Sequence, residues 1–180
     1  MNKIRLFIIS GLILVAASCA KQTDSHAGPD IPAPRIPLED FFRKPQMSGY
    51  KLSPSGKNFI YRAPVDGINN IFLKEIGKWD SIQLTHSTDR DIMRFYWGTD
   101  NDIIYLQDTD GDENYRLYKT NIFSKETNCL TDFENVNTRI IDFFPKDPLH
   151  IIIGLNKRDP KASDVYQLNI LSGDLHMVEQ

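Results

Sequence analysis

The sequence predicts an all-β fold, a partial β-propeller of about three four-stranded antiparallel blades, preceded by a signal peptide and a Pro-rich linker. Short segments rich in β-branched and aromatic residues recur with a period of about 45 residues, which is typical of propeller blades. Asp-Gly turn signals separate neighbouring segments of this kind. No stretch combines sustained helical periodicity with capping residues.

Three dipeptides show the period, because each recurs 44 to 46 positions further along the chain. The pairs are Ile60-Tyr61 and Ile104-Tyr105, Asp66-Gly67 and Asp110-Gly111, and Leu84-Thr85 and Leu130-Thr131. A third copy is looser, with Ile151-Ile152-Ile153 in the place of the next Ile-Tyr pair. The predicted blades therefore span about residues 48–86, 92–132 and 139–180.

The β-rich segments inside these blades define the expected strands. They are residues 58–63, 69–75 and 81–85 in the first blade, 92–97, 102–107, 115–121 and 127–131 in the second, and 139–144, 150–155, 164–170 and 174–178 in the third. Asp66-Gly67 is expected to close a hairpin, since glycine accepts a positive φ at little steric cost. We expect Asp89-Arg90-Asp91 to form a solvated loop between blades, and residues 157–160 to form a long hairpin tip.

Residues 1–18 read as the signal peptide of a lipoprotein. Lys3 and Arg5 precede an apolar run over residues 6–17, which is too short to span a bilayer as a helix. Val15-Ala16-Ala17-Ser18-Cys19 resembles the lipobox of bacterial lipoproteins, although Ala16 stands where that pattern most often has Leu. The resemblance implies lipidation of Cys19. The alternative is a plain secretory signal with an incidental cysteine.

We therefore expect an exported protein, lipid-anchored to a bacterial membrane and facing the periplasm or the cell surface. Residues 19–37 form the expected tether, because four prolines between positions 29 and 37 favour extended backbone. Residues 38–180 form the partial propeller. If Cys19 is acylated, Cys129 has no partner for a disulfide, and we predict a buried structural thiol there.

The charge balance argues against a nucleic-acid partner. The net charge is −3, and both signs are mixed along the chain without a basic stripe. The membrane is expected to be contacted through the lipid anchor only.

Four segments of the predicted propeller together resemble a known family of enzymes. They are Ile36-Pro37-Leu38-Glu39-Asp40-Phe41-Phe42, Leu52-Ser53-Pro54-Ser55-Gly56-Lys57, Asp108-Thr109-Asp110-Gly111-Asp112-Glu113-Asn114 and Gly154-Leu155-Asn156-Lys157-Arg158-Asp159-Pro160. In their order and spacing they are similar to the N-terminal propeller of bacterial prolyl-oligopeptidase-like (S9) serine peptidases. The resemblance covers residues 36–180. It implies proteolysis by a C-terminal α/β-hydrolase domain, with the propeller limiting access to short peptides.

The catalytic groups of such peptidases belong to the hydrolase domain, and this chain holds no match to that domain. It has no Gly-x-Ser-x-Gly nucleophile elbow. Its histidines are His26, His86, His150 and His176, which fall in the tether or in predicted strands and turns. We predict no catalytic residue and no cofactor, so the chain alone should be inactive and its status as an enzyme stays open.

The acidic segment Asp108, Asp110 and Asp112 is a weak candidate for a calcium loop, because oxygen ligands alternate around a glycine. Gly111 comes two residues too early for an EF-hand. The alternative is a charged hairpin tip, since Asp66-Gly67 holds the same place in the first blade without the acidic cluster.

Three blades fall short of the four to eight with which propellers close. We therefore expect a truncated or incomplete product of a longer gene, whose hydrolase domain and short peptide substrates would be its partners. The alternative is a non-enzymatic surface lipoprotein with a TolB-like propeller that binds a peptide, glycan or protein.

Overall fold

The computed structural model describes residues 35–179. The helix α1 (Leu38–Phe42) belongs to the first of two compact units, and all strands belong to the second, Arg43–Gln180. The helix has Glu39 and Asp40 in its first turn, where carboxylates favour a helix start, and the Asp40 amide donates to the Pro37 carbonyl. Among residues 35–179, no helix has the length and apolar character needed to cross a bilayer.

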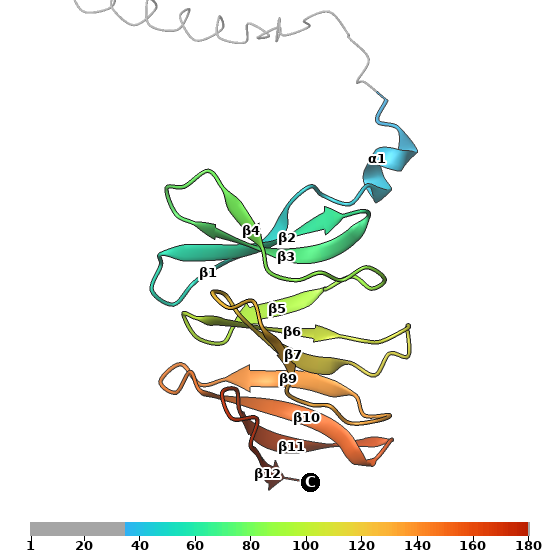
Figure 1. The fold of residues 1–180 in the computed structure, drawn as a ribbon. Coiled ribbons are helices and arrows are strands. Elements are labelled where there is room, and N and C mark those ends of the chain that lie inside the picture. The colour runs from blue at the N-terminus through green and yellow to red at the C-terminus, as the bar shows by residue number, and fades with distance from the viewer. Residues whose placement is uncertain (1–34, 180) are drawn as a thin grey trace, which may run out of the picture. The chain divides into compact units, whose positions relative to one another are not determined.

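The twelve strands of the described chain form three four-stranded antiparallel sheets (Figure 1). Sheet 1 contains β1 (Ser48–Leu52), β2 (Asn58–Val65), β3 (Ile68–Glu75) and β4 (Ser81–Gln83); sheet 2 contains β5 (Arg94–Trp97), β6 (Asp102–Gln107), β7 (Arg116–Asn121) and β8 (Thr127–Cys129); sheet 3 contains β9 (Thr138–Phe143), β10 (His150–Asp159), β11 (Ala162–Asn169) and β12 (Leu175–Glu179). In each sheet the strands neighbour one another in chain order. The predicted fold class, with three four-stranded blades, is confirmed.

The hairpin between β2 and β3 closes on the predicted turn. Asp66 and Gly67 both have positive φ, 49° and 85°, and Val65 pairs with Ile68 across them. Two central residues with positive φ define a type I′ turn, whose twist matches that of the flanking strands.

The repeated Leu-Thr dipeptide follows the outer strand in two sheets and bonds to the neighbouring strand there. The Leu84 amide donates to the Ile71 carbonyl at 2.9 Å, and the Thr85 hydroxyl accepts from the Ile71 amide at 2.8 Å. Leu130 and Thr131 repeat both bonds with Leu117, at 2.7 and 2.8 Å. The threonine hydroxyl thus takes the place of a backbone carbonyl as the hydrogen-bond acceptor. The backbone pairing therefore stops there, and strands β4 and β8 end earlier than the sequence predicts.

A second repeated feature occurs in all three sheets: a backbone hydrogen bond joins the residue that follows the third strand to the residue that precedes the second strand. The amides of Ile76, Ile122 and Ile170 each donate at 2.9 Å to a carbonyl just before the second strand of their sheet. The acceptors are Lys57, Asn101 and Leu149 respectively.

Two apolar clusters hold the sheets together, and sheet 2 contributes to both. Along β6, Ile103 and Tyr105 join the cluster with sheet 1, whereas Ile104 and Leu106 join the cluster with sheet 3. Successive side chains of a strand point to opposite faces, so this strand is buried on both sides. Its apolar run therefore reflects its place between two sheets.

One predicted hairpin tip is wrong. Lys157, Arg158 and Asp159 belong to β10, and only Pro160 and Lys161 form the turn. The register of β10 against β11 shifts between Leu155 and Asp159, so the ladder continues past an irregularity that sequence periodicity does not reveal. Pro160 lies outside the ladder, as expected of a residue without an amide hydrogen.

Candidate functional site

Five connections between strands lie at one end of the three sheets, on the right in Figure 1. We call this the charged end; it comprises residues 66–67, 84–93, 108–115, 130–137 and 160–161. Two of the four family-like segments, 108–114 and 154–160, reach this end. It is therefore the part of the described chain where a functional surface is best sought.

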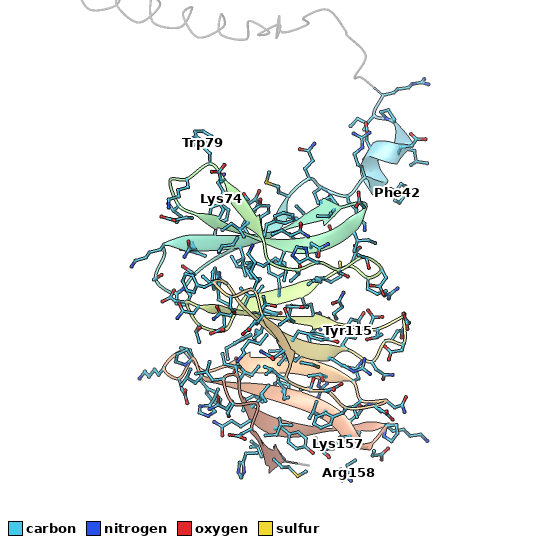
Figure 2. The ribbon with its side chains drawn as sticks, viewed as in Figure 1. Phe42, Lys74, Trp79, Tyr115, Lys157 and Arg158 are labelled. Atoms are coloured by element: carbon cyan, nitrogen blue, oxygen red, sulfur yellow. The ribbon has the colours of Figure 1, made fainter. Side chains whose placement is uncertain are left out.

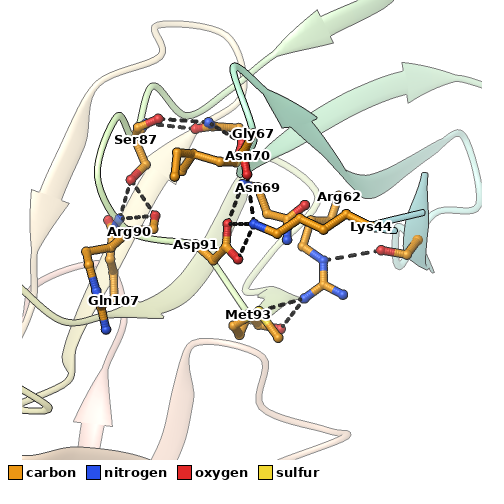
Figure 3. Close-up of polar contacts among 12 residues, drawn as sticks. Lys44, Arg62, Gly67, Asn69, Asn70, Ser87, Arg90, Asp91, Met93 and Gln107 are labelled. Atoms are coloured by element: carbon orange, nitrogen blue, oxygen red, sulfur yellow. Dashed lines mark hydrogen bonds and ion pairs between the residues drawn. The ribbon is translucent and has the colours of Figure 1, made fainter. Parts of the chain in front are cut away.

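The first network at the charged end joins Lys44 to Asp91 (Figure 3). The Lys44 Nζ lies 2.8 and 2.7 Å from the two Asp91 carboxylate oxygens and donates to the Gly67 carbonyl at 2.7 Å. The Asn69 amide donates to Asp91 Oδ1 at 2.7 Å. Partial burial raises the pKa of Asp91, but the hydrogen bonds from Asn69 and Lys44 outweigh it and hold that pKa below its usual value.

A buried asparagine fixes the connection between sheets 1 and 2 (Figure 3). The Asn70 side chain donates to the Ser87 carbonyl at 2.9 Å and accepts from the Ser87 amide at 2.7 Å. It also accepts from the Thr85 hydroxyl at 3.0 Å. From sheet 2, the Gln107 side-chain Nε2 donates to Ser87 Oγ at 2.6 Å and to the Arg90 carbonyl at 3.1 Å. The connection is thus bound to both sheets.

Arg90 and Asp108 form a two-pronged ion pair across this connection. The Arg90 Nε and Nη2 donate to Asp108 Oδ1 and Oδ2 at 3.2 and 2.8 Å. The Asp108 side chain is 3% exposed and that of Arg90 is 41% exposed. The hydrogen bond and the charge of Asp108 raise the pKa of Arg90. Gly111, with φ of 78°, lies against the guanidinium, so the β6–β7 loop folds over the pair.

The carboxylates of the calcium candidate, Asp108, Asp110 and Asp112, do not form one group of ligands in the structure. The Asp108 carboxylate is bound by Arg90, as described above. The Asp112 carboxylate instead accepts from the amides of Thr109 and Asn114 within its own loop. Burial raises the pKa of Asp112, but these hydrogen bonds bring it below its usual value. Residues 35–179 contain no cluster of three or more His, Cys, Asp or Glu placed to hold a metal ion.

Sheet 3 carries a second two-pronged pair, formed by Arg158, which is labelled in Figure 2, and Asp164. The Arg158 Nε and Nη2 donate to Asp164 Oδ2 and Oδ1 at 3.0 and 2.7 Å, and the Asp164 side chain is 1% exposed. The hydrogen bond from Arg158 lowers the pKa of Asp164. The neighbouring Lys157 Nζ lies 4.1 Å from the centroid of the Phe133 ring, a cation–π contact. Lys157, Arg158 and Asp164, which lie close to the β10–β11 turn, are thus all engaged in contacts with other side chains.

Two clefts open beside these networks. One, of about 280 Å³, is lined by residues that include His86, Ser87, Gln107 and Tyr118. The other, of about 250 Å³, is lined by Arg94, Leu106 and other residues of sheets 2 and 3 and of the connections beside them. Both are small for a ligand pocket.

His150 has structural partners on both nitrogens of its ring. His150 Nδ1 lies 2.7 Å from Asp147 Oδ2, and its Nε2 lies 3.2 Å from the Asn169 side-chain amide. Cys129 is half-buried, and burial raises the pKa of its thiol. Cys19 and the predicted signal peptide lie outside the described residues.

The fold and these networks define the class of protein first: a β-propeller-like fragment of three blades. Solved structures with this fold include TolB from Acinetobacter baumannii, with a TM-score of 0.53 and 12% identity over 73% of this chain and 31% of that one. A structure from a study of two prolyl endopeptidases gives a TM-score of 0.53 and 12% identity over 74% of this chain and 22% of that one. No family model matches the chain.

Two proteins related to the chain in sequence define its class more narrowly than the fold does. The chain is 28% identical over 167 residues to dipeptidyl aminopeptidase BIII of Pseudoxanthomonas mexicana, which is 92% of this chain and 24% of the relative. It is 30% identical over 154 residues to dipeptidyl peptidase family member 6 of Caenorhabditis elegans, 81% of this chain and 21% of the relative. The homologues are thus dipeptidyl peptidases, and the predicted resemblance to S9 peptidase propellers is confirmed. The chain spans about a quarter of the length of these relatives.

Sequence reasoning missed the networks of the charged end. Asp89-Arg90-Asp91 does connect two blades, but Arg90 and Asp91 are both engaged in ion pairs and are not simply solvated. The partners Lys44 and Asp108 lie 47 and 18 positions away, beyond any local pattern. The repeated Leu-Thr dipeptide was the one signal available, since Thr85 belongs to the Asn70 network.

Proposed function

We propose that the chain is the propeller portion of an S9-type serine peptidase, whose catalytic groups lie in a C-terminal α/β-hydrolase domain outside these 180 residues. The observation that carries this proposal is the identity to two dipeptidyl peptidases over 92% and 81% of the chain. The family-like segments 108–114 and 154–160 support it. Neither a cofactor nor a nucleic-acid partner enters the proposal.

In this proposal the charged end faces the hydrolase domain and admits only short peptides. A filter that rejects large substrates must keep its shape, and the Arg90–Asp108 pair and the Asn70 network connect successive blades at this end. Charged and polar groups also suit a wet passage, because the centres of dry interfaces are depleted of charge.

The proposed protein is exported and lipid-anchored. Residues 1–18 would be removed as a lipoprotein signal peptide, Cys19 would carry the lipid, and residues 19–37 would tether the propeller of residues 38–180. The motif that ends at Cys19 supports this arrangement. Mass spectrometry of the mature N-terminus tests it. The expected product starts with an acylated Cys19, and Cys19→Ser should release the protein from the membrane fraction; an unmodified N-terminus would leave only a secretory signal.

The alternative is a non-enzymatic lipoprotein with a TolB-like propeller; the likeness to TolB is one of fold alone. Purification of the complete gene product separates the two. The peptidase proposal predicts a Gly-x-Ser-x-Gly elbow downstream of Gln180, labelling by a fluorophosphonate probe and release of dipeptides from chromogenic substrates. The 180-residue chain, as the matched control, should be neither labelled nor active. A gene product without an elbow that resists the probe would overturn the peptidase.

A further inference from the structure

The smaller of the two clefts lies at the charged end, beside sheets 2 and 3. Three connections of that end meet at it, through Met93, Tyr115 and Asn137. Both sheets belong to the described chain, so the cleft forms without any further blade. Its volume, about 250 Å³, is below the roughly 300–1,000 Å³ of pockets for whole small molecules, so it suits one end of a larger ligand.

Hydrogen bonds between elements hold the lining of this cleft in place. The Thr138 amide donates to the Tyr115 carbonyl at 2.8 Å, which joins the β6–β7 connection to β9. From sheet 1, the Arg62 Nη1 donates to the Met93 carbonyl at 3.3 Å (Figure 3). The cleft is therefore preformed, and a ligand does not have to order these connections when it binds.

The lining of the cleft carries positive charge only. Its residues include Arg94 and Arg139 and neither Asp nor Glu. Both arginines are exposed, and neither has a side-chain hydrogen bond or an ion pair within the described chain. The other four arginines of residues 44–179 each donate side-chain hydrogen bonds; they are Arg62, Arg90, Arg116 and Arg158.

Arg94 is the arginine placed to reach a ligand in the cleft. It pairs with Leu106 across β5 and β6, and paired residues of an antiparallel ladder lie on the same face of the sheet. Leu106 belongs to the apolar cluster with sheet 3, so Arg94 lies on the face toward sheet 3. Arg139 instead pairs with Gly154, on the opposite face of sheet 3 from Leu155, which fills that cluster.

The cleft thus presents an unpaired guanidinium next to the apolar side chain of Leu106 and the ring-bearing Tyr115. A guanidinium binds a carboxylate through two parallel N–H···O bonds. A ligand that uses both features joins a carboxylate to an apolar group, and the last residue of a peptide can supply both. We propose that Arg94 binds the C-terminal carboxylate of a short peptide, whose last side chain packs against Leu106 and Tyr115.

This inference deepens the proposed function, and it rests on that function for one point, that the ligand at the charged end is a peptide. A residue that binds the C-terminus selects peptides by length, because the carboxylate of a longer chain lies too far along to reach both Arg94 and a hydrolase domain beside this end. The contact thus adds charge recognition to the rejection of large substrates.

Isothermal titration calorimetry of the complete gene product tests the site, with the elbow serine, where present, replaced by alanine so that the peptide is not consumed. The probes are Ala-Ala-Ala-Phe and its C-terminal amide. We expect the acid to bind about tenfold more tightly than the amide, as a charge-assisted hydrogen bond predicts.

Two variants of Arg94 and one control complete the series. Arg94→Gln should bind the acid as weakly as the amide, and Arg94→Lys should keep part of the preference. Both variants should fold, because the Arg94 side chain is exposed and has no partner within the described chain. Lys125→Gln removes one positive charge at the opposite end of the sheets and should bind both probes as wild type does.

Equal binding of acid and amide by wild type, or an equal loss of both in Arg94→Gln, would overturn the site. A third probe, the amide of Ala-Ala-Ala-Asp, distinguishes the two sources of a peptide carboxylate. If it binds as tightly as the acid probe, Arg94 recognises acidic side chains and the C-terminal assignment is wrong.

Fluorophosphonate labelling of the unmodified gene product keeps the site separate from the proposed peptidase. Labelling without a preference for the acid overturns the Arg94 site alone. A preference for the acid that Arg94→Gln abolishes, in a protein that the probe does not label, overturns the peptidase and supports the site.

Discussion

Thr85 and Thr131 show how one side-chain atom shapes a blade. Each hydroxyl accepts the hydrogen bond of a buried backbone amide at the point where the outer strand ends. Thr85 then donates to Asn70, which holds the connection to the next sheet. The repeat of the Leu-Thr dipeptide therefore records a hydrogen-bonding requirement and not only a β propensity.

Thr85→Val should destabilise the chain by about 1–3 kcal/mol, because the Ile71 amide would be buried without an acceptor. Urea unfolding followed by circular dichroism measures this change. Thr88→Val in the same connection is the control, since its side chain is exposed. Equal stability of the two variants would show that the hydroxyl of Thr85 contributes nothing.

Asp164→Asn should make the chain less sensitive to acid. Its pKa is lowered in the folded state by the bond from Arg158, so the folded chain takes up that proton less readily than the unfolded chain. The stabilisation is complete above the unfolded pKa of about 4 and is lost as the pH falls through the folded value. Thermal melts at pH 7 and below pH 4 should therefore show a smaller drop for Asp164→Asn than for wild type.

The control for the acid series is Asp66→Asn, which removes an exposed carboxylate while asparagine still tolerates the positive φ of the turn. It should follow the wild-type curve. If the melting temperatures of wild type and Asp164→Asn fall in parallel with pH, the Arg158–Asp164 pair does not contribute to the acid sensitivity of the chain.

At the scale of elements, the strands could be predicted because their signals are local. Each β-branched segment and the Asp66-Gly67 turn span only a few residues, and short dipeptides mark where the pattern recurs in the next blade. The extension of β10 to Asp159 could not be predicted, because an irregularity interrupts the ladder before the strand ends. The charged end could not be predicted either, since each of its pairs joins residues of different elements.

The β5–β6 turn offers a test of how tightly sheets 2 and 3 pack. A Cβ at Gly98 would lie 2.8 Å from Ile170 Cδ1, so Gly98→Ala should cost about 1–3 kcal/mol through overpacking. Ile170→Val removes that methyl group, and the double variant should recover much of the loss. Denaturant unfolding of the four proteins measures the coupling; strictly additive losses would contradict the contact.

For the whole molecule, the three sheets and the sequence relatives support the proposal that the chain is the propeller portion of a longer peptidase. Its fold is shared with TolB and with prolyl endopeptidase propellers, and its relatives are dipeptidyl peptidases about four times its length. The proposal that the charged end filters substrates by size for a hydrolase domain can be tested through Asp108. The carboxylate of this residue holds the β6–β7 loop to Arg90.

The direct measurement is kcat/KM of the complete gene product for peptides of increasing length, in wild type and Asp108→Asn, with Lys125→Ala at the opposite end as control. We expect kcat/KM to fall steeply with peptide length in wild type and in the control. We expect a shallower fall in Asp108→Asn, with dipeptide release from the shortest substrates little changed. Equal rates on short and long peptides in wild type, or a uniform loss in Asp108→Asn, would contradict the proposed size filter.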